Sequence, residues 1–478
     1  MTATPHRPHD DVFDVAVIGG GIVGAAIARE LSGHDVRVAL LDARDDVGDA
    51  TSKANTAILH TGFDAKPGTL ESRLVARGYH LLSAYAEATG IPVEHTGAVL
   101  VAWTDEELQA LPGLKEKAEA NGYTHCRIID ADEVYGLVPD LGEGALGGLT
   151  VPDESIICTW TTNLALATDA RQRGTTMLLQ HAVTGVDEGD EVTTLHTPAG
   201  DVRARWVVNA AGLGADHIDR LFGHDRFTVT PRRGELFVFD KLARPMVNKI
   251  VLPVPTSRGK GVLISPTIYG NVMLGPTAQD LTDRTDTATS EDGFDFLLTK
   301  GERLMPRLLA EEVTASYAGL RAAIDHSDYL IEAAPEQRYL LVGGIRSTGL
   351  TAGIAIAEHA RTLLEEAGLD LRPRAELPEP PRMPNIGEAG TRPYQDADLI
   401  ARDPAYGTVV CFCERVTEGE IRDACHAPVP ARNLEGLRRR TRAMNGRCQG
   451  FFCGAAVAAL REKHHTHDGC RSQHKDNR

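Results

Sequence analysis

The chain has 478 residues, of which 42% are hydrophobic and 24% charged, so it is long enough for roughly two to four globular domains. Its net charge of −17 argues against a nucleic-acid surface, because phosphate binding needs an excess of Lys and Arg. The start of the chain lacks an apolar secretory segment, and no run reaches the ~18 apolar residues of a membrane span. We therefore expect a cytoplasmic protein that does not bind nucleic acid.

Residues 14–42 predict a dinucleotide-binding unit. A short β-branched strand at 14–18 leads into a G-x-G-x-x-G turn, a helical segment at 25–31 and a second strand at 37–41 that ends at Asp42. The three glycines of the turn are Gly19, Gly21 and Gly24. The first permits the tight turn, the second lets a pyrophosphate approach the helix N-terminus, and the third lets the helix pack close. The carboxylate of Asp42 can accept hydrogen bonds from a ribose hydroxyl, which a glycine-rich turn without a ligand would not explain.

The loop at residues 49–62 consists mainly of small and hydroxylated residues, which suits close passage along a flavin. The stretch 51–70 resembles the FAD-dependent glycerol-3-phosphate dehydrogenase/oxidase branch of the D-amino-acid-oxidase-like (DAO) flavoprotein superfamily. L-2-hydroxyglutarate oxidases are similar in the same stretch. Further matches follow in the family's order at 206–212, 317–321 and 339–351. The resemblance covers about residues 12–365 and implies FAD as the cofactor.

The resemblance also implies which residues contact the flavin. Beyond the glycine turn and Asp42, these are Thr51, Ser52, Asn55, Ala57, Val183, Gly212, Gly344, Gly349, Leu350 and Thr351. The motif at 339–351 precedes a helical run, and relatives place the N-terminus of that helix against the flavin. The helix dipole there favours the anionic reduced flavin.

Flavin-dependent oxidation of an alcohol needs a base for the hydroxyl proton and a cation that anchors an acidic substrate. His60 is the candidate base, because its neutral form is available near pH 7; the alternative is a histidine that only hydrogen-bonds flavin or backbone. Arg321 is the candidate anchor, unless it forms an ordinary surface ion pair. Lys260 is assigned to the substrate anion or hydroxyl, with a solvated hairpin lysine as the alternative. Ser347 matches a substrate-side serine of the family, and Arg346 is either substrate-binding or structural.

Six of the eight cysteines follow residue 410, and four of these have a spacing that indicates a metal centre. They are Cys411, Cys413, Cys448 and Cys453, in the pattern C-x-C, then 34 residues, then C-x4-C. Four thiolates can hold two irons, and the pattern resembles the bacterioferritin-associated ferredoxin-like (BFD-like) [2Fe-2S] domain. Structural zinc is the alternative, although zinc knuckles favour C-x2-C.

The surroundings of these cysteines predict a small helical unit. Thr417 and Glu420 have the spacing of a helix capping box, and Cys425 on that helix is expected in the core rather than as a ligand. The basic residues Arg439, Arg440, Arg442 and Arg447 add positive charge nearby. For most of them we expect a solvated basic face.

The predicted fold class is α/β, with a Rossmann-type FAD-binding domain, an antiparallel-sheet substrate domain and a small helical C-terminal [2Fe-2S] domain. Gly-Asn and Gly-Lys-Gly turns within 258–277 predict the hairpins of the substrate domain. The expected segments are 1–88, 145–215 and 325–372 for the FAD-binding domain, 89–144 and 216–324 for the substrate domain, 373–407 for a linker, 408–462 for the [2Fe-2S] domain and 463–478 for a disordered tail.

Because an iron-sulfur cluster passes one electron at a time, it favours a dehydrogenase over an oxidase. The expected partners are a small anionic substrate and an electron acceptor, either a quinone, a flavoprotein or a partner subunit; any membrane contact would be peripheral and through a partner. The leading prediction is oxidation of a phosphorylated polyol, sn-glycerol 3-phosphate, to dihydroxyacetone phosphate by hydride transfer to flavin N5. The alternatives are L-2-hydroxyglutarate or another 2-hydroxy acid, an amine or amino acid, or a non-catalytic electron-transfer subunit.

Overall fold

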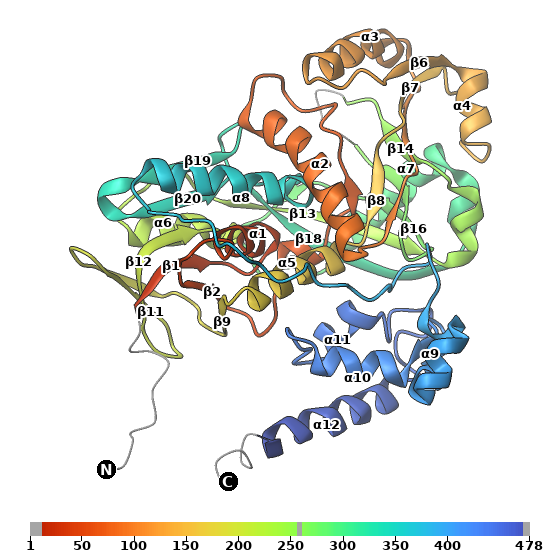
Figure 1. The fold of residues 1–478 in the computed structure, drawn as a ribbon. Coiled ribbons are helices and arrows are strands. Elements are labelled where there is room, and N and C mark those ends of the chain that lie inside the picture. Colours follow the sequence, from red (N-terminus) through yellow and green to blue (C-terminus); the bar gives the residue numbers. More distant parts are fainter. Residues whose placement is uncertain (1–11, 256–260, 472–478) are drawn as a thin grey trace, which may run out of the picture.

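The strand predicted at the N-terminus is central to an eight-stranded sheet in the computed structural model, which describes residues 12–255 and 261–471 (Figure 1). The strands are β10 (Gly185–Glu188), β11 (Thr193–His196), β12 (Val202–Asn209), β1 (Phe13–Ile18), β2 (Val38–Asp42) and β9 (Thr176–Leu179) in spatial order, with β20 (Tyr339–Gly343) beside β12 and β19 (Leu330–Ala334) beside β20. Strands β9, β2, β1, β12 and β20 run parallel, as a dinucleotide-binding sheet requires.

Alternate side chains of β1 enter different cores, because successive residues of a strand point to opposite faces. Val15 and Val17 pack against one helical layer, whereas Ala16 and Ile18 face another cluster that includes a single short helix. The first layer contains α1 (Ile22–Leu31), α2 (Leu70–Thr89), α5 (Thr159–Gln172) and α8 (Gly349–Glu366), and the second contains α6 (Ala215–Leu221). The sheet is therefore buried on both faces.

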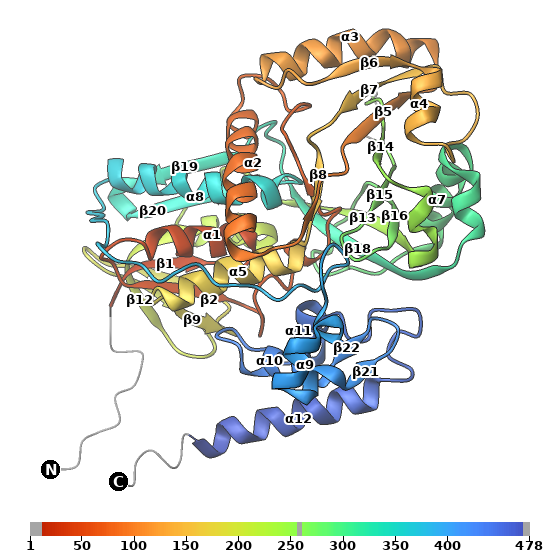
Figure 2. The same ribbon diagram turned by 45° about the vertical axis from the view of Figure 1, so that its right-hand side comes forward.

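A second sheet of nine strands forms the substrate domain (Figure 2). Its strands are β17 (Gln279–Asp280), β13 (Thr230–Phe239), β16 (Val272–Gly275), β15 (Leu263–Pro266), β14 (Ile250–Pro253), β5 (Ala98–Ala102), β7 (Gly147–Val151) and β6 (Arg127–Asp130), with β18 (Val313–Ala323) on β13. Only the β14–β5 pair is parallel among those described. Helices α3 (Asp105–Ala120), α4 (Ala131–Leu137) and α7 (Glu291–Leu304) accompany it. The predicted fold class is thus confirmed.

The boundaries between the two domains differ from the expected ones at both ends of residues 145–215. Strand β7 belongs to the substrate sheet, because it pairs along its whole length with β5. Helix α6 stays with the first sheet, since Phe222 just after it stacks on Tyr339 of β20. A third, small sheet of β3 (Ile58–Leu59), β8 (Ser155–Ile157) and β4 (Val93–Glu94) joins distant parts of the chain.

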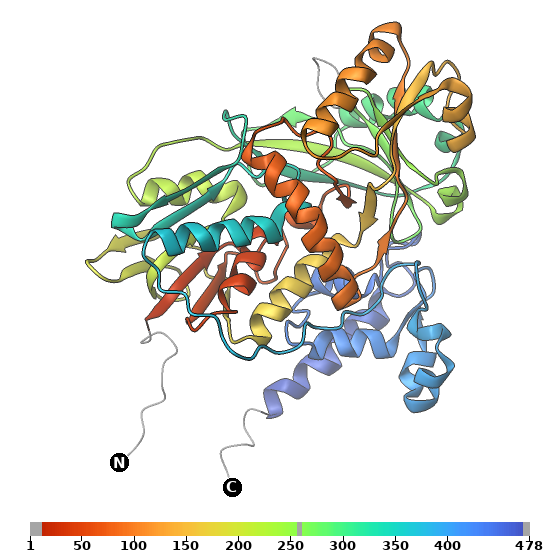
Figure 3. The ribbon, with the colours of Figure 1, turned by 45° about the horizontal axis from the view of Figure 1, so that its top comes forward.

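The segment expected to be a linker is held to the rest of the molecule. It passes along the nucleotide-binding domain as a blue trace in Figure 3 and bonds through its backbone to Thr89 and Ile268. Its end is folded, into α9 (Ala397–Arg402) between two short 3-10 turns. Arg392 is buried and pairs with Glu420 at 3.3 Å. The proline- and charge-rich composition predicts a linker, but one of its charges, Arg392, has a buried partner and the segment is held in place.

The C-terminal domain comprises β21 (Val409–Cys411), β22 (Val416–Thr417), α10 (Glu418–His426), α11 (Leu434–Thr441) and α12 (Gly454–Arg471). The capping box of Thr417 and Glu420 is present, and Cys425 is buried in the core of this domain. Helix α12 runs through Arg471 and so enters the segment for which a disordered tail is predicted. The apolar residues at the start of α12 anchor it, and the helix continues into the polar segment. In the described part of the chain, no helix is long and apolar enough to cross a membrane.

Candidate functional site

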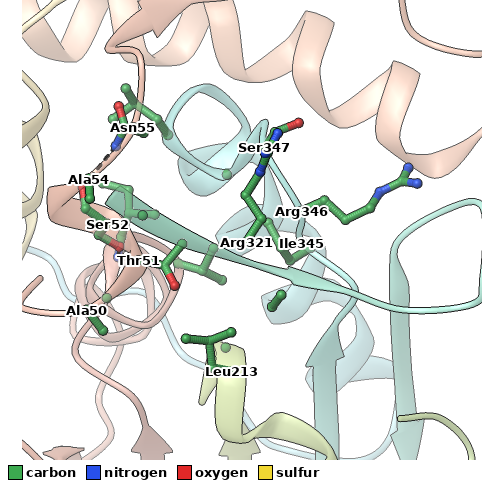
Figure 4. A pocket seen from close by; sticks show the side chains of 18 of the residues that line it. Ala50, Thr51, Ser52, Ala54, Asn55, Leu213, Arg321, Ile345, Arg346 and Ser347 are labelled. Atoms are coloured by element: carbon green, nitrogen blue, oxygen red, sulfur yellow. Dashed lines mark hydrogen bonds between the residues drawn. The ribbon is translucent and has the colours of Figure 1, made fainter. Parts of the chain in front are cut away.

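A cavity of about 570 Å³ lies between the two large sheets, at the C-terminal ends of β1, β2, β12 and β20. Ligands of open α/β sheets bind at this edge. The predicted cofactor residues that line the cavity are Gly19, Gly21, Asp42, Thr51, Ser52, Asn55, Val183, Gly212, Gly344, Gly349 and Leu350. Figure 4 shows the 50–55 loop on one side, Arg346 on the other and Arg321 between them. The structure therefore gathers these segments around one site.

The glycine turn before α1 forms a cradle that a side chain would fill. A Cβ on Gly24 would lie 1.8 Å from the carbonyl oxygen of Gly19, so only glycine allows this contact between turn and helix. A Cβ on Gly21 would lie 3.1 Å from Ser52 Oγ, in the direction of the cavity. The N-cap residue Gly21 has no side chain to cap α1, and the backbone N–H of Ile22 donates to Ser52 Oγ at 2.9 Å. The helix dipole and the open backbone fit a pyrophosphate.

Asp42 is fixed where a ribose would be bound. Its carboxylate accepts hydrogen bonds from the backbone N–H of Gly20 at 2.6 Å and of Arg44 at 2.8 Å. Burial raises the pKa of Asp42, and the N–H groups of Arg44 and Gly20 act against the rise. A hydroxyl donor from a bound nucleotide would complete the partners of this acid.

Gly24, Ala57 and Thr351, also predicted as cofactor residues, do not line the cavity but support its walls. Thr351 Oγ1 accepts a hydrogen bond from the backbone N–H of His60 at 3.0 Å. Ala57 has a positive φ of 56° and donates its N–H to Asn55 Oδ1 at 2.7 Å. Ala57 and Thr351 thus shape the loop that carries His60, the candidate base.

His60 lines the cavity and is held by a buried acid, Glu154. Leu59 pairs with Ser155 in the antiparallel pair of β3 and β8. His60, which follows Leu59, therefore lies opposite Glu154, which precedes Ser155. His60 Nδ1 lies 3.1 Å from Glu154 Oε2, and Glu154 Oε1 accepts from both the N–H and the hydroxyl of Thr61. A proton on Nδ1 leaves Nε2 as the basic nitrogen. Sequence reasoning missed Glu154, because nothing local indicates a pairing across 94 residues.

Arg321 projects from β18 into the cavity, where one guanidinium nitrogen donates to the carbonyl of Thr277 at 2.8 Å. Burial lowers its pKa, and the charge of Arg232 acts in the same direction. Three other arginines of the described cavity wall form ion pairs with carboxylates, namely Arg44, Arg284 and Arg346. Among the described residues, no carboxylate lies within ion-pair distance of Arg321. A mostly buried cation of this kind can bind an anion.

The remaining predicted substrate residues fall into different classes. Arg346 lines the cavity, and its guanidinium pairs with Glu71 and donates to the carbonyl of Ser327, contacts that fit the structural alternative for this residue. Ser347 also lines the cavity and is exposed. Lys260 lies outside the described residues.

The four predicted ligand cysteines lie together as two interacting pairs, Cys411 with Cys453 and Cys413 with Cys448. The pKa of Cys448 is lowered, above all by the backbone N–H of Phe452, and the N–H groups of its neighbours act the same way. Within the described ranges, no three His, Cys, Asp or Glu side chains enclose a point suited to one metal ion. The paired thiols and the N–H groups aimed at a sulfur fit a cluster in which each iron binds two thiolates.

Replacing Cys413 by serine is expected to remove the visible absorbance of the cluster and most of its iron, which in the native protein should be about two atoms per chain. Metal analysis and visible spectra of protein purified without oxygen would measure both. Cys425→Ala is the matched control, because this cysteine is buried in the same domain and is not one of the four predicted ligands. Full iron content in the serine variant, or zinc in the native protein, would contradict the assignment.

The predicted solvated basic face is wrong for Arg439, Arg440 and Arg442, which are all buried. Arg442 Nε pairs with Glu414 at 2.9 Å within the same domain. Arg447 is half-exposed and pairs with Asp240 of the substrate domain. The local sequence is basic, but its acidic partners are distant along the chain.

Arg439 and Arg440 attach the C-terminal domain to the nucleotide-binding domain. Arg440 binds both oxygens of Asp46, at 2.7 and 2.8 Å, and Arg439 bridges Asp46 at 2.6 Å and Asp49 at 2.5 Å. We call these four residues the arginine clasp. Both acids precede the loop of Thr51 and Ser52 that lines the cavity. The clasp therefore positions the cysteine domain beside the cavity loop.

Asp46→Asn is expected to destabilise the docked C-terminal domain by about 3 kcal/mol at neutral pH, because two buried guanidiniums lose their shared charge. Burial alone would raise the pKa of Asp46, but Arg440 and Arg439 outweigh it and the pKa is lowered. The stabilisation is therefore present above the unfolded pKa of about 3.9 and is lost as the pH falls through the lower folded pKa.

Calorimetry of the native protein and the variant over this pH range would test the clasp. The first unfolding transition should occur at lower temperature in the variant near neutral pH, and the difference should shrink in acid. Asp45→Asn is the control, since Asp45 accepts a hydrogen bond from Asn433 at 2.8 Å and forms no ion pair among the described residues. Equal effects of the two substitutions would contradict a special role for Asp46.

Comparison with known proteins matches residues 14–363 to the family described as FAD dependent oxidoreductase (DAO) and residues 409–462 to the BFD-like [2Fe-2S] binding domain. A glycerol 3-phosphate dehydrogenase of Caloramator mitchellensis is 34% identical over 94% of this chain and 94% of its own length. An L-2-hydroxyglutarate dehydrogenase of Escherichia coli K12 is 27% identical over 67% and 76%. The dithionite-reduced L-α-glycerophosphate oxidase of Mycoplasma pneumoniae with FAD bound superposes with a TM-score of 0.74 at 28% identity, over 79% of this chain and 100% of that one.

Proposed function

This chain belongs to the DAO family of FAD-dependent oxidoreductases and carries a BFD-like [2Fe-2S] domain, and from this we propose that it is a dehydrogenase that converts sn-glycerol 3-phosphate to dihydroxyacetone phosphate. The predictions of FAD and of a [2Fe-2S] cluster are confirmed by the family matches. The observation that supports the substrate best is Arg321, a mostly buried cation that faces the same cavity as the His60–Glu154 pair.

The charges of the cavity wall favour a substrate with one anionic end. Arg44, Arg284 and Arg346 already have carboxylate partners, which leaves Arg321 as the arginine of the described wall without one. A dicarboxylate such as 2-hydroxyglutarate would engage a second cation, and the described wall offers no second arginine without a carboxylate partner. A phosphomonoester needs one fork of N–H donors, which a guanidinium supplies.

FAD, when bound, supplies the acceptor for the hydride that leaves the substrate carbon. Arg321 then binds the phosphate and orients the rest of the substrate within the cavity. His60 takes the hydroxyl proton at Nε2, and Glu154 holds the ring through Nδ1 and stabilises the imidazolium that forms. Thr61 keeps the Glu154 carboxylate in place.

The acceptor of the electrons is proposed to approach the exposed side of the cysteine domain, whether it is a quinone, a flavoprotein or a partner subunit. Phe412, Phe451 and Phe452, which lie between the ligand cysteines, are 76, 84 and 79% exposed. Exposed aromatic side chains in one place are typical of interaction sites.

An anaerobic absorbance spectrum before and after addition of sn-glycerol 3-phosphate tests the proposal. We expect the flavin band to bleach. L-2-hydroxyglutarate and a set of amino acids added under the same conditions provide the comparison. A flavin that stays oxidised with glycerol 3-phosphate but bleaches with one of the others would overturn the substrate and retain the reaction type.

A further inference from the structure

We propose that Trp160, Tyr269 and Arg442 form the path by which electrons pass from the flavin site to the cluster site. The proposal rests on the redox chemistry of the proposed function, but it does not depend on which substrate reduces the flavin. It is carried by a continuous set of contacts that begins at the cavity wall and ends beside a ligand cysteine.

The path begins at the 50–55 loop. A single backbone segment separates the cavity from Trp160 there. Thr51, Ser52, Ala54 and Asn55 line the cavity. On the loop's other side, Trp160 Nε1 donates a hydrogen bond to the carbonyl of Lys53 at 3.0 Å. The indole is therefore bonded directly to the backbone that borders the flavin cavity.

Two aromatic rings and a cation follow. The rings of Trp160 and Tyr269 are stacked, with centroids 5.0 Å apart and planes inclined by 25°. The guanidinium of Arg442 lies 4.1 Å from the centroid of Tyr269 and 5.9 Å from that of Trp160. Tyr269 and Arg442 are buried and Trp160 is partly buried, so the three delocalised groups form one stack that is largely shielded from water.

The stack ends at the cluster ligands. Arg442 Nε donates to Glu414 at 2.9 Å, and Glu414 follows Cys413 directly in the chain. The segment after Arg442 also packs against this cysteine, since a Cβ on Gly446 would lie 2.3 Å from Cys413 Cβ. Delocalised π-systems in continuous contact couple two sites better than aliphatic side chains or water gaps do.

Arg442 has an electrostatic part in the path. A cluster with four thiolate ligands is anionic, so the entry of an electron is opposed by its charge. A guanidinium beside the path stabilises the electron on the way, and Glu414 keeps Arg442 in place. If this contact served packing alone, an apolar side chain on the two rings would be enough. Arg442 instead places a buried positive charge on Trp160 and Tyr269.

The electron balance closes with two equivalents of a one-electron acceptor, one for each electron that leaves the reduced flavin. The reduced flavin gives up two electrons and one proton, which passes to solvent. Each electron reduces one ferric ion of the cluster in turn, and the first leaves to a one-electron acceptor, such as a redox protein, before the second arrives. The flavin is oxidised and the acceptor is reduced.

The test uses the holoprotein without substrate, so a wrong substrate assignment cannot affect it. A light-driven reductant delivers electrons to the flavin, and reduction of the cluster is followed by absorbance and by EPR of frozen samples. Trp160→Leu is expected to slow cluster reduction by about tenfold or more, whereas Trp160→Phe, which keeps a ring, should stay much closer to the native rate.

Redox titration must show unchanged midpoint potentials of both centres in these variants, because a merely structural role would act through potential or cofactor loss. Phe237→Leu is the matched control, since it removes an aromatic partner of Phe294 inside the substrate domain. If Trp160→Leu fails to fold, Arg442→Lys keeps the charge and removes the planar group, and it should also slow the transfer. A native rate in a leucine or lysine variant with both cofactors bound would overturn the path.

Discussion

His60→Asn is expected to slow reduction of the bound flavin by sn-glycerol 3-phosphate by roughly 10²- to 10⁴-fold, the range for loss of a general base. The imidazole lines the cavity, and its Nδ1 is occupied by Glu154, so Nε2 is the atom that can accept the hydroxyl proton. Asparagine has a similar size but no basic nitrogen. Anaerobic rapid mixing, with the flavin absorbance as the signal, would measure the rate.

Glu154→Gln is the companion variant, because Glu154 acts only through His60. The amide keeps the shape of the side chain but removes the charge that stabilises the imidazolium. We expect flavin reduction to slow by about tenfold or more, with less loss than in His60→Asn. Flavin and iron contents should equal those of the native protein in both variants. A native rate in His60→Asn would leave this histidine as a hydrogen-bonding group and remove it from the chemistry.

The parts of the site that could be predicted from the sequence depend on neighbours in the chain. The turn of Gly19 to Gly24 is predictable from its G-x-G-x-x-G pattern, and the structure shows why the last glycine is needed: a Cβ on Gly24 would lie 1.8 Å from the carbonyl oxygen of Gly19. The capping box of Thr417 and Glu420 is equally local. Such features are set by backbone geometry within a few residues and leave a pattern in the sequence.

The parts that could not be predicted depend on contacts between distant segments. His60 was assigned by resemblance, but its partner Glu154 is 94 residues away and gives no local signal. Arg439 and Arg440 were expected in solvent because four arginines occur close together, yet Asp46 binds both from another domain. Composition reports the charge of a segment, whereas its burial depends on what the fold brings against it.

Residues 392–407 are a second segment whose structure depends on contacts with distant parts of the chain. Proline and charge at this density usually indicate a linker. Here Arg392 is buried against Glu420, and helix α9 lies beside α10 of the cysteine domain (Figure 2). The Arg392–Glu420 pair ties a segment with the composition of a linker to the cysteine domain, and the sequence pattern does not reveal this pair.

Arg321→Met is expected to lower kcat/KM for sn-glycerol 3-phosphate by roughly 10²- to 10⁴-fold, because a bidentate contact to an anion contributes about 1.5–3 kcal/mol for each hydrogen bond. Methionine keeps the length of the side chain but removes both the charge and the N–H donors. Steady-state rates with an artificial one-electron acceptor would measure the loss, and reduction by dithionite should remain normal, since it needs no substrate anchor.

Arg232→Met is the matched control for this arginine. Arg232 lies opposite Arg321 in the β13–β18 register, but it is paired with Asp280 and half-exposed, so the change should be small. Arg321→Lys, which keeps the charge but not the fork of donors, should fall between the two. If Arg321→Met behaved as Arg232→Met does, the cation would not anchor a substrate. The chain would then act as a carrier of electrons, because a carrier needs the flavin and the cluster but no anion-binding group beside them.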